Sequence, residues 1–207
     1  MLTPKDSFLG KQFWNRYIKY IIHADFKGIH ISRKPQISLD KSVLVLSNHF
    51  SWWDGFFVWQ LNRMLLNKKY HVMMLEEQLK KNSFLRTAGA FSIDRSNMRK
   101  AITSLNYAAE LLEDSGNMVL MFPQGQIESQ HVNKPSFRSG VVRIAQKVTA
   151  PFDIVFCINL IDYFSDRKPI IQSYLREYEG PLELESMRKA FYSHYEDCKK
   201  SQGKLIS

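Results

Sequence analysis

Cysteine is scarce in this chain, and long apolar runs are absent. Cys157 and Cys198 are the only cysteines in 207 residues, and their separation gives neither a zinc-site spacing nor a disulfide framework, as is typical of a reducing compartment. His23 and His30 are seven residues apart, which is a poor spacing for metal ligands. No apolar run approaches the ~20 residues of a membrane-spanning helix, and the first residues lack the apolar core of a signal peptide. The sequence therefore predicts no metal site, no disulfide and no transmembrane helix.

Several catalytic and binding signatures are also missing. The chain has no Gly-x-Ser-x-Gly elbow for a nucleophilic serine. It has no recognisable nucleic-acid-binding motif and no dense basic run with interleaved aromatic residues. We find no repeat and no low-complexity segment. These absences argue against a covalent serine intermediate and against nucleic acid as a partner.

The size and charge of the chain fit one domain with an anionic partner. A length of 207 residues with 44% hydrophobic content supports a globular fold with a sizeable core. The 29 basic and 20 acidic side chains give a net charge of +9, which favours an anionic partner of either kind, nucleic acid or lipid. Since no nucleic-acid motif occurs, we favour an anionic lipid surface.

Residues 1–24 are predicted to form an amphipathic helix. After Pro4 and a possible Ser7 cap, apolar residues recur at helical spacing among basic and polar ones. They are Leu9, Phe13, Trp14, Tyr17, Ile18, Ile21 and Ile22. A basic face opposite an aromatic-rich one is typical of helices at a bilayer interface, where we expect Phe13 and Trp14 to enter the lipid. Packing of the same apolar stripe on the protein's own core is the alternative, and the two roles are compatible.

Residues 25–207 alternate between strand and helix patterns. This order predicts an α/β fold, a single layered domain with a mixed, largely parallel sheet flanked by helices. We expect strands at 26–32, 43–46, 70–75, 91–93, 118–122, 153–160 and 169–178, and helices at 56–65, 98–112, 141–148 and 184–198. Ser96 is expected to cap the helix at 98–112 and Gly116 to end it, while 76–87 is expected to be a solvated helical turn. The polar loop at 127–136 is long enough to act as a lid.

The strongest candidate for chemistry is the stretch from Ser47 to Asp54. His49 and Asp54 follow a buried strand pattern and precede a helical one, so they are expected in a strand-to-helix turn, where open α/β sheets bind ligands. A histidine held by a carboxylate can take a proton from a hydroxyl group, and Asp54 would fix its tautomer and stabilise the imidazolium. The alternative is a capped helix start, with Asn48 or Ser51 as N-cap and His49 merely packed.

Four stretches in this order resemble the sequence blocks of the lysophospholipid acyltransferase superfamily, which includes 1-acylglycerol-3-phosphate acyltransferases. Residues 48–54 match its Asn-His-x-x-x-x-Asp block, and residues 89–95 match its Gly-x-x-Phe-Ile-x-Arg block. Residues 122–129 resemble an altered Phe-Pro-Glu-Gly-Thr-Arg-Ser block, and the apolar residues 151–158 resemble the fourth block. The resemblance spans roughly residues 42–158.

The resemblance implies a peripheral enzyme on the cytoplasmic face of a membrane. Such an enzyme transfers a fatty acyl group from acyl-CoA or acyl-carrier protein, as co-substrate, to the hydroxyl of a lysophospholipid-type acceptor, without a metal or another cofactor. His49 would be the general base and Asp54 its orienting carboxylate. Substrate contacts would come from Asn48, Arg95, Gln124, Gly125 and Gln126.

For Arg95 and Gly125, the sequence itself also gives a physical reason to expect contact with a ligand. A guanidinium at the end of a strand, as expected for Arg95, suits bidentate recognition of phosphate, although a surface arginine paired with Asp94 or Glu128 is the alternative. Gly125 follows a buried strand in a sharp turn, where its backbone could approach a ligand closely and offer amides to an oxyanion. A plain tight turn is the alternative there.

The third block departs from the family pattern. The Glu, Thr and Arg of the pattern fall on Gln124, Gln126 and Ile127, so a carboxylate and a guanidinium are missing. Compensation of the lost phosphate contact would have to come from Arg95, Lys134 or Arg138. We expect this compensation to be incomplete and the acceptor to carry a bulkier or uncharged head, such as a lyso-phosphodiester or a sugar. The alternatives are an O-acyltransferase for a glycolipid, a glycosylated terpenoid or an aminolipid, and a catalytically silent membrane-binding relative.

Overall fold

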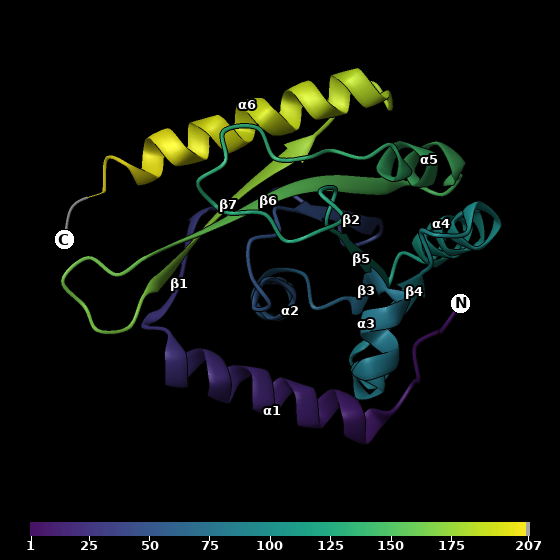
Figure 1. The fold of residues 1–207 in the computed structure, drawn as a ribbon, viewed down its shortest axis with the longest axis horizontal. Coiled ribbons are helices and arrows are strands. Elements are labelled where there is room, and N and C mark those ends of the chain that lie inside the picture. Colours follow the sequence, from purple (N-terminus) through teal and green to yellow (C-terminus); the bar gives the residue numbers. More distant parts are fainter. Residues whose placement is uncertain (206–207) are drawn as a thin grey trace.

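Seven strands form one sheet in the order β1-β7-β6-β2-β5-β3-β4, as Figure 1 shows for the computed structural model, which describes residues 1–205. The strands are β1 (Gly28–Arg33), β2 (Ser42–Ser47), β3 (Lys69–Leu75), β4 (Ala90–Ile93), β5 (Asn117–Met121), β6 (Phe152–Asp162) and β7 (Ile170–Tyr178). The β6–β7 pair is antiparallel and the other neighbouring strands are parallel. The predicted mixed, largely parallel sheet is confirmed.

Helices cover both faces of the sheet. They are α1 (Phe8–Asp25), α2 (Asp54–Leu65), α3 (Glu76–Lys81), α4 (Met98–Leu112), α5 (Gly140–Lys147) and α6 (Leu184–Gln202), with a 3₁₀ helix, η1, at Ser83–Ala88. In Figure 1, α1 and α2 lie below the sheet, and α5 and α6 lie above it. Side chains of β2 alternate between the two layers, so Val43 and Val45 pack toward α1 and α2 while Leu44 and Leu46 pack toward α4, α5 and α6. The continuous apolar run therefore forms a strand that is buried on both faces.

Helix α1 is split between the core and the surface. Ser7 caps it as predicted, because its Oγ accepts a hydrogen bond from the amide of Gly10 at 2.9 Å. The buried stripe consists of Trp14, Ile18, Ile21 and Ile22, whereas Phe8, Leu9, Phe13, Tyr17 and Tyr20 are exposed. The expectation that Trp14 enters lipid is wrong: its ring is 2% exposed and its Nε1 donates to Thr87 Oγ1 at 2.9 Å. None of the helices within residues 1–205 combines the length and apolarity needed to cross a bilayer.

Helix α4 spans residues 98–112 as predicted, but its N-cap lies one residue later than predicted. Its N-cap is Asn97, whose Oδ1 accepts from the amide of Lys100 at 3.1 Å. Ser96 lies outside the cap, and its hydroxyl and amide both donate to Asp94. The helix also ends before Gly116, with Glu113 as C-cap.

The segment at 76–87 is less solvated than predicted. It divides into α3 and η1. Leu79 of α3 and Leu85 of η1 are buried in the core layer between α1 and the sheet. This segment therefore helps to build the interior next to the carboxyl edge of the sheet.

Candidate active site

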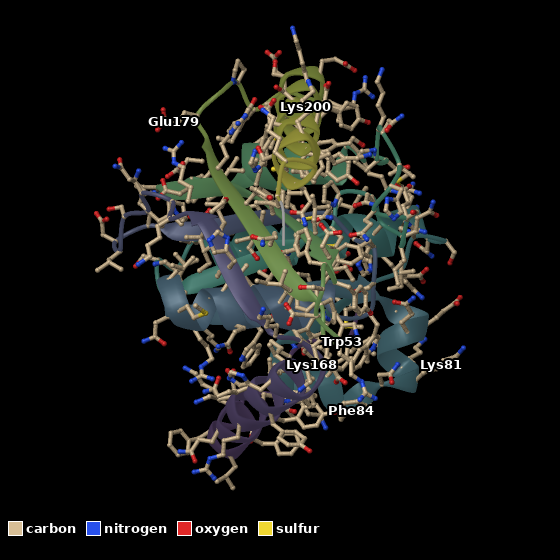
Figure 2. The ribbon with its side chains drawn as sticks, turned by 90° about the vertical axis from the view of Figure 1, so that its left-hand side faces the viewer. Trp53, Lys81, Phe84, Lys168, Glu179 and Lys200 are labelled. Atoms are coloured by element: carbon tan, nitrogen blue, oxygen red, sulfur yellow. The ribbon has the colours of Figure 1, made fainter. Side chains whose placement is uncertain are left out.

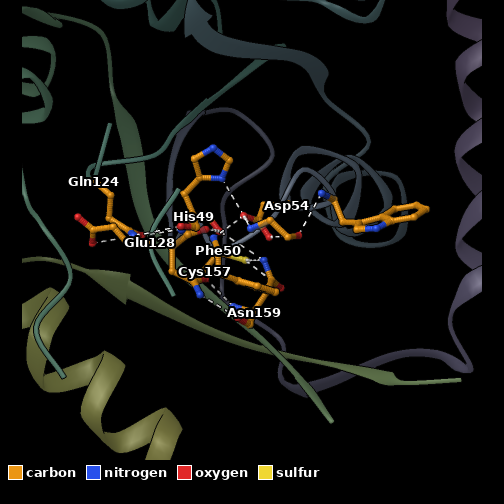
Figure 3. Close-up of polar contacts among 11 residues, drawn as sticks. His49, Phe50, Asp54, Gln124, Glu128, Cys157 and Asn159 are labelled. Carbon is orange, nitrogen blue, oxygen red and sulfur yellow. Dashed lines mark hydrogen bonds and ion pairs between the residues drawn. The ribbon is translucent and has the colours of Figure 1, made fainter. Parts of the chain in front are cut away.

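His49 and Asp54 form a direct pair at the carboxyl end of β2. His49 Nδ1 lies 2.7 Å from Asp54 Oδ2, and Asp54 is fully buried at the first position of α2 (Figure 3). The same carboxylate oxygen accepts the amides of Phe50 and Ser51 at 2.7 and 2.9 Å, and the Ser51 hydroxyl donates to the other oxygen at 3.2 Å. The carboxylate accepts a hydrogen bond from Nδ1–H of His49, which leaves Nε2 as the nitrogen with the free lone pair.

The remaining ring nitrogen of His49 is available for a substrate. In Figure 3 it points away from Asp54. The ring stacks on Phe122 with centroids 4.1 Å apart, and its side chain keeps a 21% exposed fraction. Asp54 and Phe122 thus fix the ring while one edge remains open. The capped-helix alternative fails here, because Trp53 is the N-cap of α2 and it makes no side-chain capping bond.

A side-chain amide holds the backbone of His49. Gln124 Oε1 accepts the His49 amide at 2.6 Å, and Gln124 Nε2 donates to the His49 carbonyl at 3.1 Å. Gln124 thus pairs with residue 49 as a neighbouring strand would, and it is only 2% exposed. These contacts favour a positioning role for Gln124 over the predicted substrate contact.

Asn48 makes the equivalent contact on the other side. Its Nδ2 donates to the Asn159 carbonyl and its Oδ1 accepts the Asn159 amide, both at 2.8 Å. The side chain thereby continues the pairing of β2 with β6 after the main chain has turned away. Asn48 is buried like Gln124, so its contacts favour positioning as well.

Glu128 connects this arrangement to the following loop. Its Oε2 accepts from Gln124 Nε2 at 3.0 Å and from the Ser136 amide at 2.9 Å, and its own amide donates to the His49 carbonyl at 2.9 Å. Burial raises the pKa of Glu128, but the hydrogen bonds from Ser136, Gln124 and Gln126 outweigh it and hold the pKa below its usual value. Glu128 is therefore a stable anion behind His49.

Two arginines converge on Gly125. Arg95 Nη1 donates to the Gly125 carbonyl at 2.8 Å and Arg138 Nε donates to the Gln124 carbonyl at 3.0 Å. A Cβ on residue 125 would lie 2.6 Å from Arg95 Nη1 and 2.7 Å from Arg138 Nε, and its φ is +69°, so only glycine fits. Asp94 pairs with Lys100 instead of Arg95, which removes the ion-pair alternative for Arg95 with that residue.

The amide of Gly125 is not free for an oxyanion. It donates to the Phe122 carbonyl at 3.0 Å and closes the turn. Within residues 1–205, the amides of Gln126 and Ile127 have no protein acceptor, so they are the free donors of this turn. The sequence pointed to the amide of Gly125 in this turn, whereas the available amides lie one and two residues further along.

A cavity of about 550 Å³, the main cavity, opens beside these groups. His49, Arg95, Gly125, Gln126 and Arg138 line one part of it. The other part is mostly apolar and reaches Trp59 and Tyr70 between α1, α2 and β3, with Ile18, Phe56, Met74 and Leu85 in its walls. The main cavity combines a basic, proton-accepting end with an apolar interior, which suits a ligand with a polar head and an alkyl chain.

The structure thus sorts the predicted residues into two groups. His49, Arg95, Gly125 and Gln126 line the main cavity, whereas Asp54, Asn48 and Gln124 lie behind His49. Glu128 and Arg138 also belong to the site. The sequence suggested Arg138 only as one of three possible replacements for the missing guanidinium, and Glu128 only as a possible ion-pair partner of Arg95.

Comparison with known proteins gives the family and the fold of the chain. The sequence model of the family described as Acyltransferase matches residues 27–158. A search of the curated proteins gave no match. Among solved structures, the chain is similar to the 1-acyl-sn-glycerophosphate (LPA) acyltransferase PlsC from Thermotoga maritima, with a TM-score of 0.64 and 16% identity, over 95% of this chain and 80% of that one. At this identity the likeness shows a shared fold.

Proposed function

Because this chain belongs to the acyltransferase family, we propose that it moves a fatty acyl group from a thioester, acyl-CoA or acyl-carrier protein, to the hydroxyl of a lyso-lipid. The observation that carries this proposal is the His49–Asp54 pair at 2.7 Å, whose free ring edge lies in the main cavity. No serine or cysteine nucleophile is needed, because the acceptor's own hydroxyl attacks the thioester.

Each step of the reaction has a group in the main cavity. His49 Nε2 takes the proton of the acceptor hydroxyl as its oxygen attacks the thioester carbonyl, and Asp54 stabilises the imidazolium that results. The tetrahedral oxyanion would meet the free amides of Gln126 and Ile127. Collapse expels the thiolate, which takes the proton from His49. The apolar part of the cavity would hold the acyl chain.

Two guanidinium groups support a phosphate on the acceptor. The sequence favoured a bulkier or uncharged head because Ile127 replaces the arginine of the third block. Arg138 brings a guanidinium to the same turn, next to that of Arg95, and each guanidinium donates one hydrogen bond to a backbone carbonyl. The other N–H groups can bind a phosphate, where charge-assisted bonds contribute about 1.5–3 kcal/mol each. We therefore favour a lysophosphatidic acid-type acceptor over the uncharged one.

The exposed side of α1 supports attachment to a membrane, here proposed to be its cytoplasmic face. Phe13, Tyr17 and Tyr20 are exposed on α1, and Phe84 of η1, which stacks on Trp14 of α1, is exposed as well. Figure 2 shows α1 and Phe84 at the end of the molecule opposite Lys200 of α6. Arg16 and Lys19 lie among the exposed aromatic residues of α1, as expected for an interfacial helix on an anionic surface. Deleting residues 1–22 would remove core residues, so Phe13→Ser with Tyr20→Ser is the better test. Vesicle flotation that is unchanged in this variant would place the membrane contact elsewhere.

Mass spectrometry of the products formed from labelled acyl-CoA and a panel of lyso-lipids and glycolipids tests the reaction. We expect His49→Ala to lower the rate about 10²–10⁴-fold with an unchanged circular dichroism spectrum. His23→Ala, an exposed histidine on α1, serves as the control. A wild-type protein that neither transfers acyl groups nor hydrolyses the thioester would instead support a silent membrane-binding relative.

The same panel separates the acceptors. Arg138→Gln should lower the use of lysophosphatidic acid by one to two decades while leaving uncharged acceptors unaffected, and Arg143→Gln on α5 is the matched control. Preferred use of a glycolipid by the wild type would restore the uncharged acceptor.

A further inference from the structure

A second cavity, the basic pocket, lies at the opposite edge of the sheet from His49. It has a volume of about 280 Å³ and is formed by the start of α1, the end of α2 and the start of β3. His49 and Arg63 lie near opposite ends of the 12-residue helix α2, which spans about 18 Å. Trp59 and Tyr70, whose rings are 4.8 Å apart, line both cavities and stand between them. The reaction proposed above uses no group of the basic pocket.

The pocket wall carries an excess of positive charge. Five cationic side chains line it, against the single carboxylate of Asp6; they are Lys5, Lys11, Arg63, Lys68 and Lys69. Two of the five are committed to other groups: Lys69 pairs with Asp6 at 2.9 Å, and Lys68 Nζ donates to the Leu39 and Ser115 carbonyls. Burial lowers the pKa of Lys68, whose Nζ is bonded to residues outside the pocket wall.

The other three cations are available to a ligand. Within residues 1–205, Lys5 and Lys11 have no side-chain partner at all. Arg63 donates through one nitrogen to the Asn15 carbonyl at 3.0 Å. The first turn of α1 also contains no acidic residue, so its amides and dipole add to the positive potential. Three unneutralised cations around a concave space suit a phosphate better than a single carboxylate.

The setting of the basic pocket points to a lipid as the source of that phosphate. Phe8 lines the pocket and is 75% exposed, and it belongs to the helix whose outer face is proposed to contact the bilayer. We propose that the basic pocket binds the phosphate-bearing headgroup of an anionic membrane lipid, beside the chains that Phe8 would contact. This inference rests on the proposed membrane attachment through α1, and it adds a specific headgroup site to that attachment.

Flotation of the full chain on vesicles with and without phosphatidylglycerol tests the site. Lys5→Gln with Lys11→Gln removes two charges without breaking a hydrogen bond or ion pair of the described residues. The matched control is Arg16→Gln with Lys19→Gln, which removes two charges from the same helix outside the pocket. Both pairs lie near the proposed membrane surface, so both variants should lose the diffuse attraction of about 1 kcal/mol per basic residue. Because the pocket variant also loses the headgroup contact, we expect it to bind the anionic vesicles at least ~10-fold more weakly than the control variant. Equal losses would mean diffuse attraction and would overturn the site.

Two further arms identify the ligand. The pocket variant and the control variant should bind equally well to vesicles that carry the same charge on a fatty carboxylate, because the site recognises phosphate. Weaker binding of the pocket variant to these vesicles would overturn the phosphate specificity. Inorganic phosphate at millimolar concentration should not displace the wild type from the anionic vesicles, and displacement would assign the pocket to free phosphate.

Acyl transfer measured in detergent should be equal for both variants, since neither pair lies in the main cavity. A wild type that is inactive in detergent but shows the vesicle difference would refute the enzyme reaction and leave the headgroup site standing.

Discussion

Replacing Gln124 by glutamate, the residue that the third block of the family would carry, tests how the His49 backbone is held. A glutamate keeps the oxygen that accepts the His49 amide, but its second oxygen replaces Nε2. That oxygen would face the His49 carbonyl and the Glu128 carboxylate, which lie 3.1 and 3.0 Å from Nε2. Two hydrogen bonds would thus become contacts between acceptors.

The size of the effect follows from burial. Each buried acceptor left without its donor costs about 1–3 kcal/mol, and two carboxylates at ~3 Å cannot readily both ionise. We expect Gln124→Glu to lower the free energy of unfolding by about 3–5 kcal/mol at pH 7. The loss should be smaller at pH 5, because the two carboxylates can then share a proton. If His49 shifts by about 1 Å, kcat should fall by about 100-fold.

A double-mutant cycle with Glu128→Ser, the family's residue at that position, provides the assay. Urea unfolding and acyl transfer are measured for both single variants and for the double variant, which removes the opposed carboxylate. We expect the double variant to be at least ~2 kcal/mol more stable than the sum of the single effects predicts. The control is Gln12→Glu, the same chemical change at an exposed position of α1. Additive effects within about 0.5 kcal/mol would refute the coupling between Gln124 and Glu128.

Two other predictions concern the interior. Trp59→Ala should lengthen the apolar part of the main cavity and shift the products toward longer acyl chains, as measured by mass spectrometry with an acyl-CoA series; an unchanged profile would show that Trp59 does not close the cavity. Burial lowers the pKa of His194 to about 4. Between about pH 6.5 and 4, His194 is therefore protonated in the unfolded chain but neutral in the folded one. Stability should therefore fall by about 2 kcal/mol from pH 7 to pH 5, and His194→Gln should flatten this slope in urea titrations; an equal slope in the variant would assign the acid sensitivity to other groups.

The sequence predicted the elements that depend on local pattern. Apolar runs such as 43–46 and 118–122 became buried strands, and the four-residue gap between His49 and Asp54 sufficed to predict their pairing. Both features arise because neighbours along the chain also meet in space. Whether a single residue of α1 is exposed or buried was harder to predict. Phe13 and Trp14 are adjacent in sequence, and only the side of the helix that faces the core decides that Trp14 is buried and Phe13 exposed.

The contacts that the sequence could not predict join distant segments. Gln124 reaches His49 across 75 residues and Asn48 reaches Asn159 across 111 residues. Both contacts depend on the sheet order, in which β5 and β6 lie on either side of β2. A glutamine and an asparagine in turns carry no sign of this in the sequence. Their amides were therefore assigned to the substrate, whereas the structure shows them bound to backbone.

The altered third block keeps its charges but takes them from other positions. The carboxylate absent at residue 124 is present at Glu128, which accepts from the Gln124 amide. The guanidinium absent at residue 127 is present at Arg138, because the Arg138 amide bonds to the Pro123 carbonyl at 3.0 Å and returns the loop to the turn. Ile127 is then free to be apolar; it is 53% exposed at the main cavity, where it can contact the chain of a lipid acceptor. The departures from the family pattern are therefore coupled through one loop, and each position considered alone predicts a weaker anion site than the one we propose.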